Sequence, residues 1–521
     1  MKKILALLLA AALVLSLAAC SGKTAKDDSK EKDTSSSSAS ETEKEEGGED
    51  VSSDPSTWPV IKVEATGNFA EGESKEEDIE KAMNDYLVSI NAGAQVDLIT
   101  LAFGDRATQL TLLLTDPDNG IDLYGWRFYS TVTNLVKNKQ CISLEPYREQ
   151  YPDLWELYPE DVYKVCQVNG EQYSIPGGDS FGNFQVYTMR KDIVDEIGLS
   201  DWIGTKLTEE QFEELLTKAE EAHPELGWFT QTNNVNYIGI DSLGFDEWIG
   251  VLENNGIGEE TITDWYASDE WKQYCYRMKD FADKGFFVDD PLNQQLTAAS
   301  VNQQLIGGYL FEGYSVDYCQ SLMLAQRPDW DMAIFQLGDF VGKNSTVYTG
   351  WQISSVCKYP DEAMKILYLL NTDPTFARYL MLGIEGEQYV VDEEGRAWYP
   401  EGVDQTTSGW NSGAAWWYPN QTISLPFESP LANYYTDMIA CWTDPNSQYS
   451  SGLGFIFDTT PVYDEYQACT ATVNEYKNAL LFGQIDDVDE ALQSFNAELD
   501  ANGRQAILAE MQKQYDEFLG K

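Results

Sequence analysis

The residues able to do chemistry are restricted in type. The chain has 521 residues, of which 87 are acidic, 34 are basic and one is histidine. A single imidazole excludes two-histidine zinc sites, and a serine or cysteine triad would need His223 as its base. His223 follows an acidic, helix-like run and precedes Pro224, which is typical of a solvated surface histidine. Paired carboxylates, the machinery of glycoside hydrolases, stay open as an alternative.

The spacing of the cysteines does not indicate thiol redox chemistry, and the spacing of the acidic residues does not indicate a metal site. Apart from Cys20, seven cysteines remain, and none forms a Cys-x-x-Cys pair. An odd number requires at least one free thiol unless one pairs between chains, and buried reduced thiols are the simpler state. The acidic runs at 264–269 and 486–489 lack the spacing of a calcium loop. We therefore expect no metal and no cofactor.

Charge and aromatic content point toward a neutral ligand. The formal net charge is -53, and no basic patch interrupts it, so nucleic acid and anionic surfaces are excluded as partners. Aromatic residues make up 13% of the chain. Aromatic rings pack on the apolar face of a pyranose, while planar amide, carboxylate and guanidinium groups pair with its hydroxyls. Gly125-Trp126-Arg127-Phe128-Tyr129 concentrates such residues after a predicted strand.

The elements that must position these residues alternate in type. Strand patterns at 60–65, 96–102 and 120–124 are separated by helical patterns at 74–91 and 106–114. This alternation predicts an α/β body with a mixed or parallel sheet, whose ligands lie at the carboxyl ends of strands. Asn169-Gly170 predicts a hairpin between strands at 163–168 and 171–175. Residues 463–519 are helical by periodicity, with breaks near Gly483 and Asn502-Gly503.

The N-terminus has the pattern of an export signal. Met1-Lys2-Lys3 precedes an apolar run to Ala19, too short to span a membrane comfortably. Leu17-Ala18-Ala19-Cys20 is similar to a bacterial lipobox, although an ordinary signal with an incidental cysteine is the alternative. We expect a signal peptide at 1–19, lipidation at Cys20, and an acidic, serine-rich disordered tether over 20–57.

Several segments together resemble the family 1 extracellular solute-binding proteins of ABC importers, in the lipoprotein branch with a C-terminal extension. No single segment suffices, but their order and spacing match over nearly the whole body. They are Leu101-Ala102-Phe103-Gly104-Asp105, Asn169-Gly170-Glu171-Gln172-Tyr173-Ser174-Ile175-Pro176, Arg190-Lys191-Asp192, Pro360-Asp361-Glu362-Ala363-Met364-Lys365, Gly383-Ile384-Glu385-Gly386-Glu387-Gln388-Tyr389, Gly454-Phe455-Ile456-Phe457-Asp458 and Ala509-Glu510-Met511-Gln512-Lys513-Gln514-Tyr515.

The resemblance implies a two-lobed α/β fold of the periplasmic binding protein (Venus flytrap) type, with discontinuous lobes and a helical C-terminal extension. We expect the first lobe at 58–178 plus about 300–340, and the second at 179–299 plus about 341–521. The resemblance also implies a protein that is not an enzyme. It would be a monomer anchored by lipid to the outer face of a bacterial, Gram-positive cell membrane, and it would deliver an oligosaccharide to a two-subunit permease. A peptide ligand on the same fold is the alternative, and a secreted glycoside hydrolase is a less favoured one.

Candidate ligand-binding residues are the aromatic and planar polar residues in loops where this fold has its cleft. Any one tryptophan among them could equally be a packing residue. The candidates are Trp126, Arg127, Asp179, Phe181, Asn183, Glu312, Tyr314, Trp351, Trp410, Trp416 and Trp417.

Overall fold

We analysed a computed structural model of the chain. It describes residues 54–67, 74–178, 181–230, 232–293, 305–313, 319, 331–344, 349–410, 418–429 and 431–521. All of them belong to one compact unit, Val51–Lys521. The expected signal peptide, Cys20 and most of the expected tether lie outside the described residues. The last residues of the expected tether form a short 3-10 turn, Pro55–Thr57. The Asp54 side chain caps this turn by accepting a hydrogen bond from the Ser56 amide.

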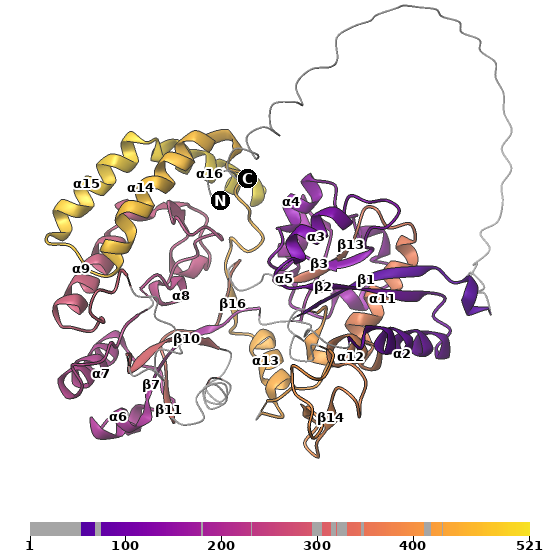
Figure 1. Ribbon diagram of the computed structural model, residues 1–521. Coiled ribbons are helices and arrows are strands. Elements are labelled where there is room, and N and C mark those ends of the chain that lie inside the picture. The colour runs from indigo at the N-terminus through magenta and orange to yellow at the C-terminus, as the bar shows by residue number, and fades with distance from the viewer. Residues whose placement is uncertain are drawn as a thin grey trace, which may run out of the picture. The chain divides into compact units, whose positions relative to one another are not determined.

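The first lobe is built on a five-stranded sheet of order β2-β1-β3-β13-β6 (Figure 1). β1 (Val60–Gly67) runs parallel to β2 (Gln95–Ala102) and β3 (Leu123–Gly125). β13 (Gly350–Ile353) is antiparallel to β3 and to β6 (Ile175–Pro176). The parallel part confirms the predicted α/β pattern.

Helices of the first lobe bury one apolar side each. In α2 (Glu76–Ser89) the buried residues are Ile79, Met83 and Leu87, four residues apart, so they share one face of the helix. The chain continues through α3 (Arg106–Leu113) and α4 (Val132–Lys137). α11 (Pro360–Thr372) and α12 (Pro374–Leu382) contribute to the same core as β1 and α2. This core extends to Trp410 and Tyr418.

The second lobe has its own antiparallel sheet of order β10-β7-β11. β7 (Phe184–Arg190) lies between β10 (Gly308–Gly313) and β11 (Met332–Gln336). Two groups of helices cover its core: those between β7 and β10 in the sequence, and the C-terminal helices. The first group comprises α6 (Lys191–Glu196), α7 (Glu209–Ala222), α8 (Val235–Ile238) and α9 (Asp269–Asp283).

Strand pairing contradicts the expected lobe boundaries. We expected residues 300–340 in the first lobe, but β10 and β11 both pair with β7 and complete the second sheet. We expected residues 341–521 in the second lobe, but β13 returns to the first sheet, and α11, α12 and Trp410 pack in that core. The physical reason is that β7 is the central strand of an antiparallel sheet, so each of its edges needs a partner strand. Here β10 and β11, from later in the chain, are those partners.

Short paired segments mark the passage between the two sheets. β12 (Val341–Gly342) pairs in parallel with β16 (Gln448–Tyr449). Asn183 forms a further antiparallel bridge to Val341, just before β7 begins. Three passages of the chain, at Asn183, at β12 and at β16, therefore lie side by side. The third passage follows α13 (Tyr434–Thr443).

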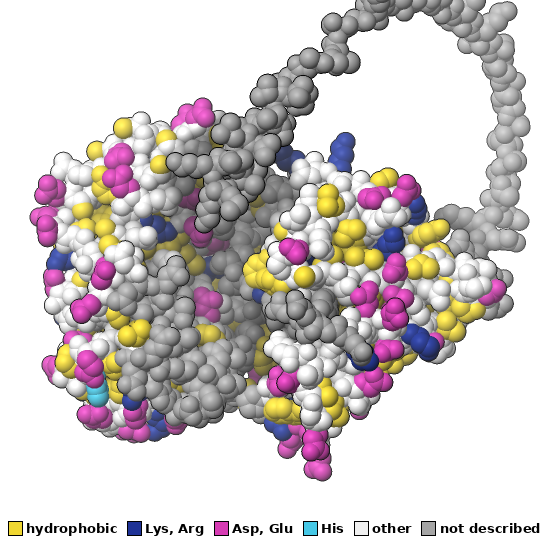
Figure 2. Space-filling model, in the orientation of Figure 1, with side chains coloured by type: hydrophobic (Ala, Val, Ile, Leu, Met, Phe, Trp, Pro, Cys, Tyr) yellow, Lys and Arg dark blue, Asp and Glu magenta, His cyan; other side chains and the backbone are white. Residues whose placement is uncertain are grey.

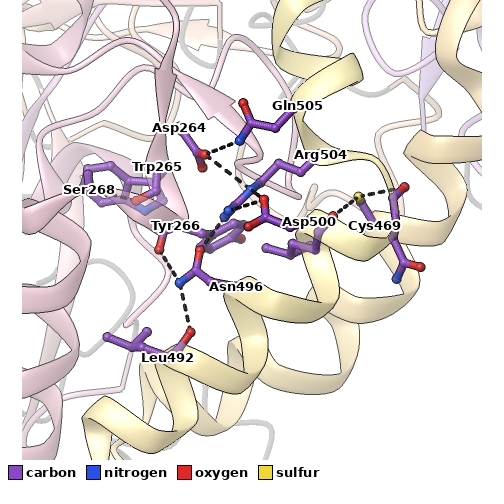
Figure 3. Close-up of polar contacts among 12 residues, drawn as sticks. Asp264, Trp265, Tyr266, Ser268, Cys469, Leu492, Asn496, Asp500, Arg504 and Gln505 are labelled. Carbon is purple, nitrogen blue, oxygen red and sulfur yellow. Dashed lines mark hydrogen bonds and ion pairs between the residues drawn. The ribbon is translucent and has the colours of Figure 1, made fainter.

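The C-terminal extension is helical, as predicted, and is tied to the second lobe. It consists of α14 (Tyr463–Leu481), α15 (Val488–Ala501) and α16 (Arg504–Phe518). Figure 3 shows buried Arg504 reaching Asp264, with Nε 3.3 Å from Oδ2, while Nη2 donates to Asp500 Oδ1 over 2.6 Å. Asn496 accepts from the same guanidinium and donates to the Tyr266 carbonyl over 2.9 Å. These contacts join α15 and α16 to β9 (Thr263–Asp264) and to the 3-10 turn that follows it, Trp265–Ala267.

Acidic side chains are spread over the face that Figure 2 shows. There, Asp and Glu side chains are scattered over both lobes rather than gathered in one patch. Among the described residues, no helix is both long and apolar enough to cross a membrane.

Candidate functional site

A buried ion pair positions the aromatic loop that follows β3. Glu64 in β1 and Arg106 at the start of α3 are almost fully inaccessible to solvent. Arg106 Nε donates to Glu64 Oε1 over 2.5 Å and Nη2 donates to Oε2 over 3.1 Å. The same guanidinium donates to the carbonyls of Gly125 (2.6 Å) and Arg127 (2.8 Å). Charge-assisted bonds of this kind are the strong ones, so they fix the loop backbone at the carboxyl end of β3.

Within this loop the structure separates three neighbouring side chains. Trp126 is only 6% exposed and Arg127 only 7% exposed, whereas Phe128 is 63% exposed. A Cβ at Gly350 would lie 2.6 Å from Trp126 Nε1, so the glycine in β13 is what lets the indole pack against that strand. Phe128 also makes an edge contact with exposed Phe103, with ring centroids 6.3 Å apart. The ring of this loop most accessible to a ligand is therefore Phe128, which is not among the candidate residues predicted from the sequence.

A pocket of about 720 Å³ lies beside this loop. Its first wall is formed by Trp126, Phe128, residues 130–134, Lys137 and Val165 of the first lobe. The other wall is formed by residues 243–245 and 454–460 together with Asn344. The volume falls within the range of ~300–1,000 Å³ that is usual for small-molecule sites.

A cluster of amides around one carboxylate lies at the start of the second sheet. Asn183 Nδ2 donates to Glu312 Oε2 over 2.7 Å. Asn236 Nδ2 donates to Glu312 Oε1 over 2.8 Å and to Asn183 Oδ1 over 2.9 Å. Asn234, which caps α8, donates to Glu312 Oε1 over 3.3 Å. All four side chains are half-buried, so solvent still reaches the group.

This cluster, hereafter the amide cluster, brings together two residues that sequence reasoning chose and two that it missed. Asn183 and Glu312 are 129 positions apart, and the antiparallel pairing of β7 with β10 places them beside each other. Asn234 and Asn236 were missed, although the run Asn233-Asn234-Val235-Asn236 is a local enrichment in amides that could have indicated them. Planar groups with both donors and acceptors suit the hydroxyls of a neutral polyol.

Buried charges lie near the amide cluster. Lys343, which follows β12, is buried and donates from Nζ to the Ile240 carbonyl over 2.8 Å. Burial lowers its pKa to about 8, against the attraction of Asp241 and Glu312. Burial raises the pKa of Asp241, while hydrogen bonds from Ser450 Oγ (2.5 Å) and the Leu243 amide oppose this shift. The crossing thus holds two buried ionisable side chains, Lys343 and Asp241, and the charge of Glu312 also acts on Lys343.

Phe181 packs where the chain crosses toward β7. Its ring centroid lies 4.8 Å from that of Tyr158 and 4.5 Å from that of Trp442 in α13. The side chain is fully buried, so it holds the crossing together rather than presenting a ring face.

Two other aromatic candidates lie in the core of the first lobe. Trp351 in β13 is 0% exposed and packs near Tyr418, with ring centroids 6.2 Å apart. Trp410 is buried, and its Nε1 donates to the Leu380 carbonyl over 3.0 Å. Each ring is enclosed by protein atoms, so both tryptophans are packing residues, the alternative that the sequence allowed for each of them. Asp179, Tyr314, Trp416 and Trp417 lie outside the described residues.

The remaining chemistry-bearing groups form no reactive constellation within the described residues. His223 directly follows α7 and contacts Glu196 and Glu225, and its pKa is raised mainly by the hydrogen bond to Glu196. All seven cysteines after Cys20 are free thiols, and five are buried. Burial raises the pKa of Cys166 to about 12, which keeps it protonated and unreactive. No group of three or more metal-ligating side chains occurs in the described ranges.

Comparisons with known proteins give a consistent picture. Residues 451–520 match a family described as a domain of unknown function, DUF3502. A Streptococcus pneumoniae serotype 4 protein, described as a carbohydrate ABC transporter substrate-binding protein, is 25% identical over 490 residues, covering 90% of this chain and 92% of the relative.

Solved structures share the fold. The N-glycan transport solute-binding protein NgtS of Streptococcus pneumoniae has a TM-score of 0.71 at 21% identity, covering 89% of this chain and 99% of that chain. NgtS in complex with Man1GlcNAc gives 0.61, again at 21% identity, with coverage of 89% and 100%. A human milk oligosaccharide (HMO) binding protein from Bifidobacterium longum infantis gives 0.55 at 14% identity, with coverage of 89% and 99%. The two-lobed fold and the resemblance to solute-binding proteins of ABC importers are confirmed.

Proposed function

We propose that this chain is the substrate-binding protein of a carbohydrate ABC importer, and that it captures a neutral oligosaccharide between its lobes and passes it to a two-subunit permease. The observation that carries the proposal is the 25% identity to a carbohydrate ABC transporter substrate-binding protein over 90% of the chain. The relatives named above are binding proteins rather than enzymes, in line with the expected absence of catalysis.

The amide cluster and the loop after β3 support a sugar as the ligand. Glu312 offers a carboxylate held by Asn183 and Asn236, and Phe128 offers an exposed ring. Carboxylates accept from vicinal hydroxyls, and aromatic rings stack on the apolar face of a pyranose. These two features lie on different lobes, so a ligand touching both would favour a closed arrangement of the lobes. The crossing at β12 and β16 is the proposed hinge.

The proposed ligand contacts keep most of the sequence candidates. Asn183 and Glu312 act directly, Arg127 supports Phe128 with its guanidinium 5.2 Å from the ring centroid, and Trp126 lines the same pocket. Asp179, Tyr314, Trp416 and Trp417 remain proposed contacts on the strength of their residue types. Phe181, Trp351 and Trp410 are proposed to stabilise the lobes instead, because they are buried.

The N-terminal sequence supports export and lipid anchoring. Residues 1–19 act as the signal peptide, Cys20 carries the lipid, and the tether holds a monomeric binding protein on the outer face of a Gram-positive cell membrane. Cys20→Ala should release the protein into the medium, whereas mass spectrometry of an unmodified, membrane-bound Cys20 would contradict lipidation.

Calorimetry against a panel of ligands tests the proposal. The panel contains Man1GlcNAc, Man5GlcNAc, a human milk oligosaccharide and unrelated peptides of similar mass. Saturable binding of at least one oligosaccharide, recovered intact after prolonged incubation, is expected. Binding of peptides with no sugar signal would reject the ligand class, and time-dependent cleavage of the sugar would favour a hydrolase.

A further inference from the structure

Residues 451–460, hereafter the partition segment, lie at the start of the domain of unknown function. They belong to no helix or strand except the first residue of a short 3-10 turn at Thr460–Val462. Residues 454–460 line the 720 Å³ pocket on one side. Residues 454–456 and 458 also line a second hollow of about 880 Å³. The segment therefore borders two hollows.

The partition segment is held at its N-terminal part by one asparagine. Asn344 Nδ2 donates to the carbonyls of Gly452 (3.0 Å) and Phe455 (2.9 Å), and Asn344 Oδ1 accepts from the Gly454 amide over 2.7 Å. Gly454 has a φ of +89° and approaches the first lobe so closely that a Cβ there would lie 2.6 Å from the Lys164 carbonyl oxygen. The segment thus contacts both lobes.

Helix α16 holds the C-terminal part of the segment. Gln514 Oε1 accepts from the Asp458 amide over 2.8 Å, and Gln514 Nε2 donates to the Asp458 carbonyl over 2.9 Å. Phe455 packs edge-on against Tyr515 with ring centroids 5.1 Å apart. Arg504 connects the same helix to the second lobe. The C-terminal helices therefore fix the position of the partition segment relative to that lobe.

The chemistry of the pocket suits a neutral, hydroxyl-rich ligand. The exposed ring of Phe128 offers a stacking face on the first wall. On the other wall Asp458 accepts through Oδ1 from Thr460 Oγ1 over 2.6 Å and is exposed. Lys137, whose Nζ is 3.9 Å from Asp458 Oδ2, balances that charge. A balanced pair beside an aromatic ring favours neither an anion nor a cation.

We infer that the C-terminal domain of unknown function supplies one wall of an oligosaccharide subsite, in which Phe128 stacks on a sugar ring and Asp458 accepts hydrogen bonds from its hydroxyls. This inference rests on the proposed carbohydrate binding and deepens it. It gives the domain a role in ligand specificity, with the helices α14–α16 fixing the position of the partition segment.

Two variants, each with a matched control variant, test the inference. Their affinities are measured by calorimetry, with the oligosaccharide that binds the wild type most tightly in the panel described under Proposed function. Phe128→Ala should weaken binding about tenfold, and Asp458→Asn by about fivefold to tenfold. Asp489→Asn is the control for Asp458, because Asp489 is also an exposed carboxylate of the same domain paired with a lysine. Tyr359→Ala is the control for Phe128, because it is an exposed aromatic residue of the first lobe outside the pocket. Neither control should change the affinity.

Hydrogen exchange of the wild-type protein gives a second measurement that does not depend on a variant folding. Saturation with the same oligosaccharide should slow exchange in peptides covering the partition segment, but not in those covering Asp489. If the wild type binds sugar while both variants bind like the controls and the segment gains no protection, the inference is overturned and the proposed function stands. If no oligosaccharide binds the wild type, the proposed function fails and the inference fails with it.

Discussion

Glu64→Gln is expected to destabilise the first lobe strongly. Glu64 accepts four hydrogen bonds, two from Arg106, one from Thr66 Oγ1 (2.5 Å) and one from the Gly125 amide (2.9 Å). Glutamine keeps the shape but removes the charge and turns one acceptor into a donor facing other donors. Because Arg106 is buried, its charge would then lack a counter-charge, and breaking a buried pair in this way costs about 3–5 kcal/mol.

Native-state hydrogen exchange measures this loss where it occurs. The two lobes have separate cores, so a single unfolding midpoint would mix their stabilities. The free energy of opening for amides of β1 and β2 should fall by the stated amount, while that for β7 stays unchanged. Asp85→Asn is the control, because it removes only an exposed ion pair with Lys81, and the free energy of opening of the same amides should stay nearly unchanged.

A double variant separates the charge from the packing. Glu64→Leu combined with Arg106→Met removes both charges, and much of the lost stability should return, because buried pairs can often be replaced by apolar side chains. A loss below about 1 kcal/mol for Glu64→Gln would refute the view that this pair holds the loop after β3.

Three further outcomes follow from the site and the cores. Asn236→Ala should weaken oligosaccharide binding by about tenfold in calorimetry, because Glu312 loses a 2.8 Å donor; unchanged affinity would remove the amide cluster from the site. Trp351→Ala should lower the free energy of opening of the first lobe by about 3–5 kcal/mol, measured by native-state hydrogen exchange of β1 and β2, and a loss near zero would contradict its burial. For Lys343, the folded pKa of about 8 lies below the unfolded value, so the unfolded state binds more protons above pH 8 and this residue adds stability as pH rises from about 8 to 10.5. The stability difference between Lys343→Met and wild type should therefore change across that range in thermal melts, and a constant difference would contradict the burial of Lys343 beside Asp241.

Local patterns predicted the elements well. The four-residue spacing of Ile79, Met83 and Leu87 indicated the helix that α2 forms, and Asn169-Gly170 indicated a hairpin turn. Both turn residues have positive φ, as such a turn requires. The hairpin strands are shorter than predicted, because residues 160–166 are helical before β4 (Gln167–Val168) pairs with β5 (Glu171–Gln172).

Long-range pairing could not be read from local patterns. Nothing in the residues near 308 and 332 says that the strands they form both pair with β7, more than 115 positions earlier. The same limit applies to burial within the site. Trp351 and Phe128 are both aromatic residues beside predicted strands, and only the packing of β13 against its neighbours decides that one is enclosed and the other exposed.

A crystal structure of the protein with its tightest-binding oligosaccharide is the most direct test of sugar capture between the lobes. We predict an intact sugar chain that contacts the amide cluster through Glu312 and Asn236 and stacks on Phe128 near the partition segment. A sugar that touches neither the amide cluster nor Phe128, or a cleaved sugar, would contradict this mode of capture.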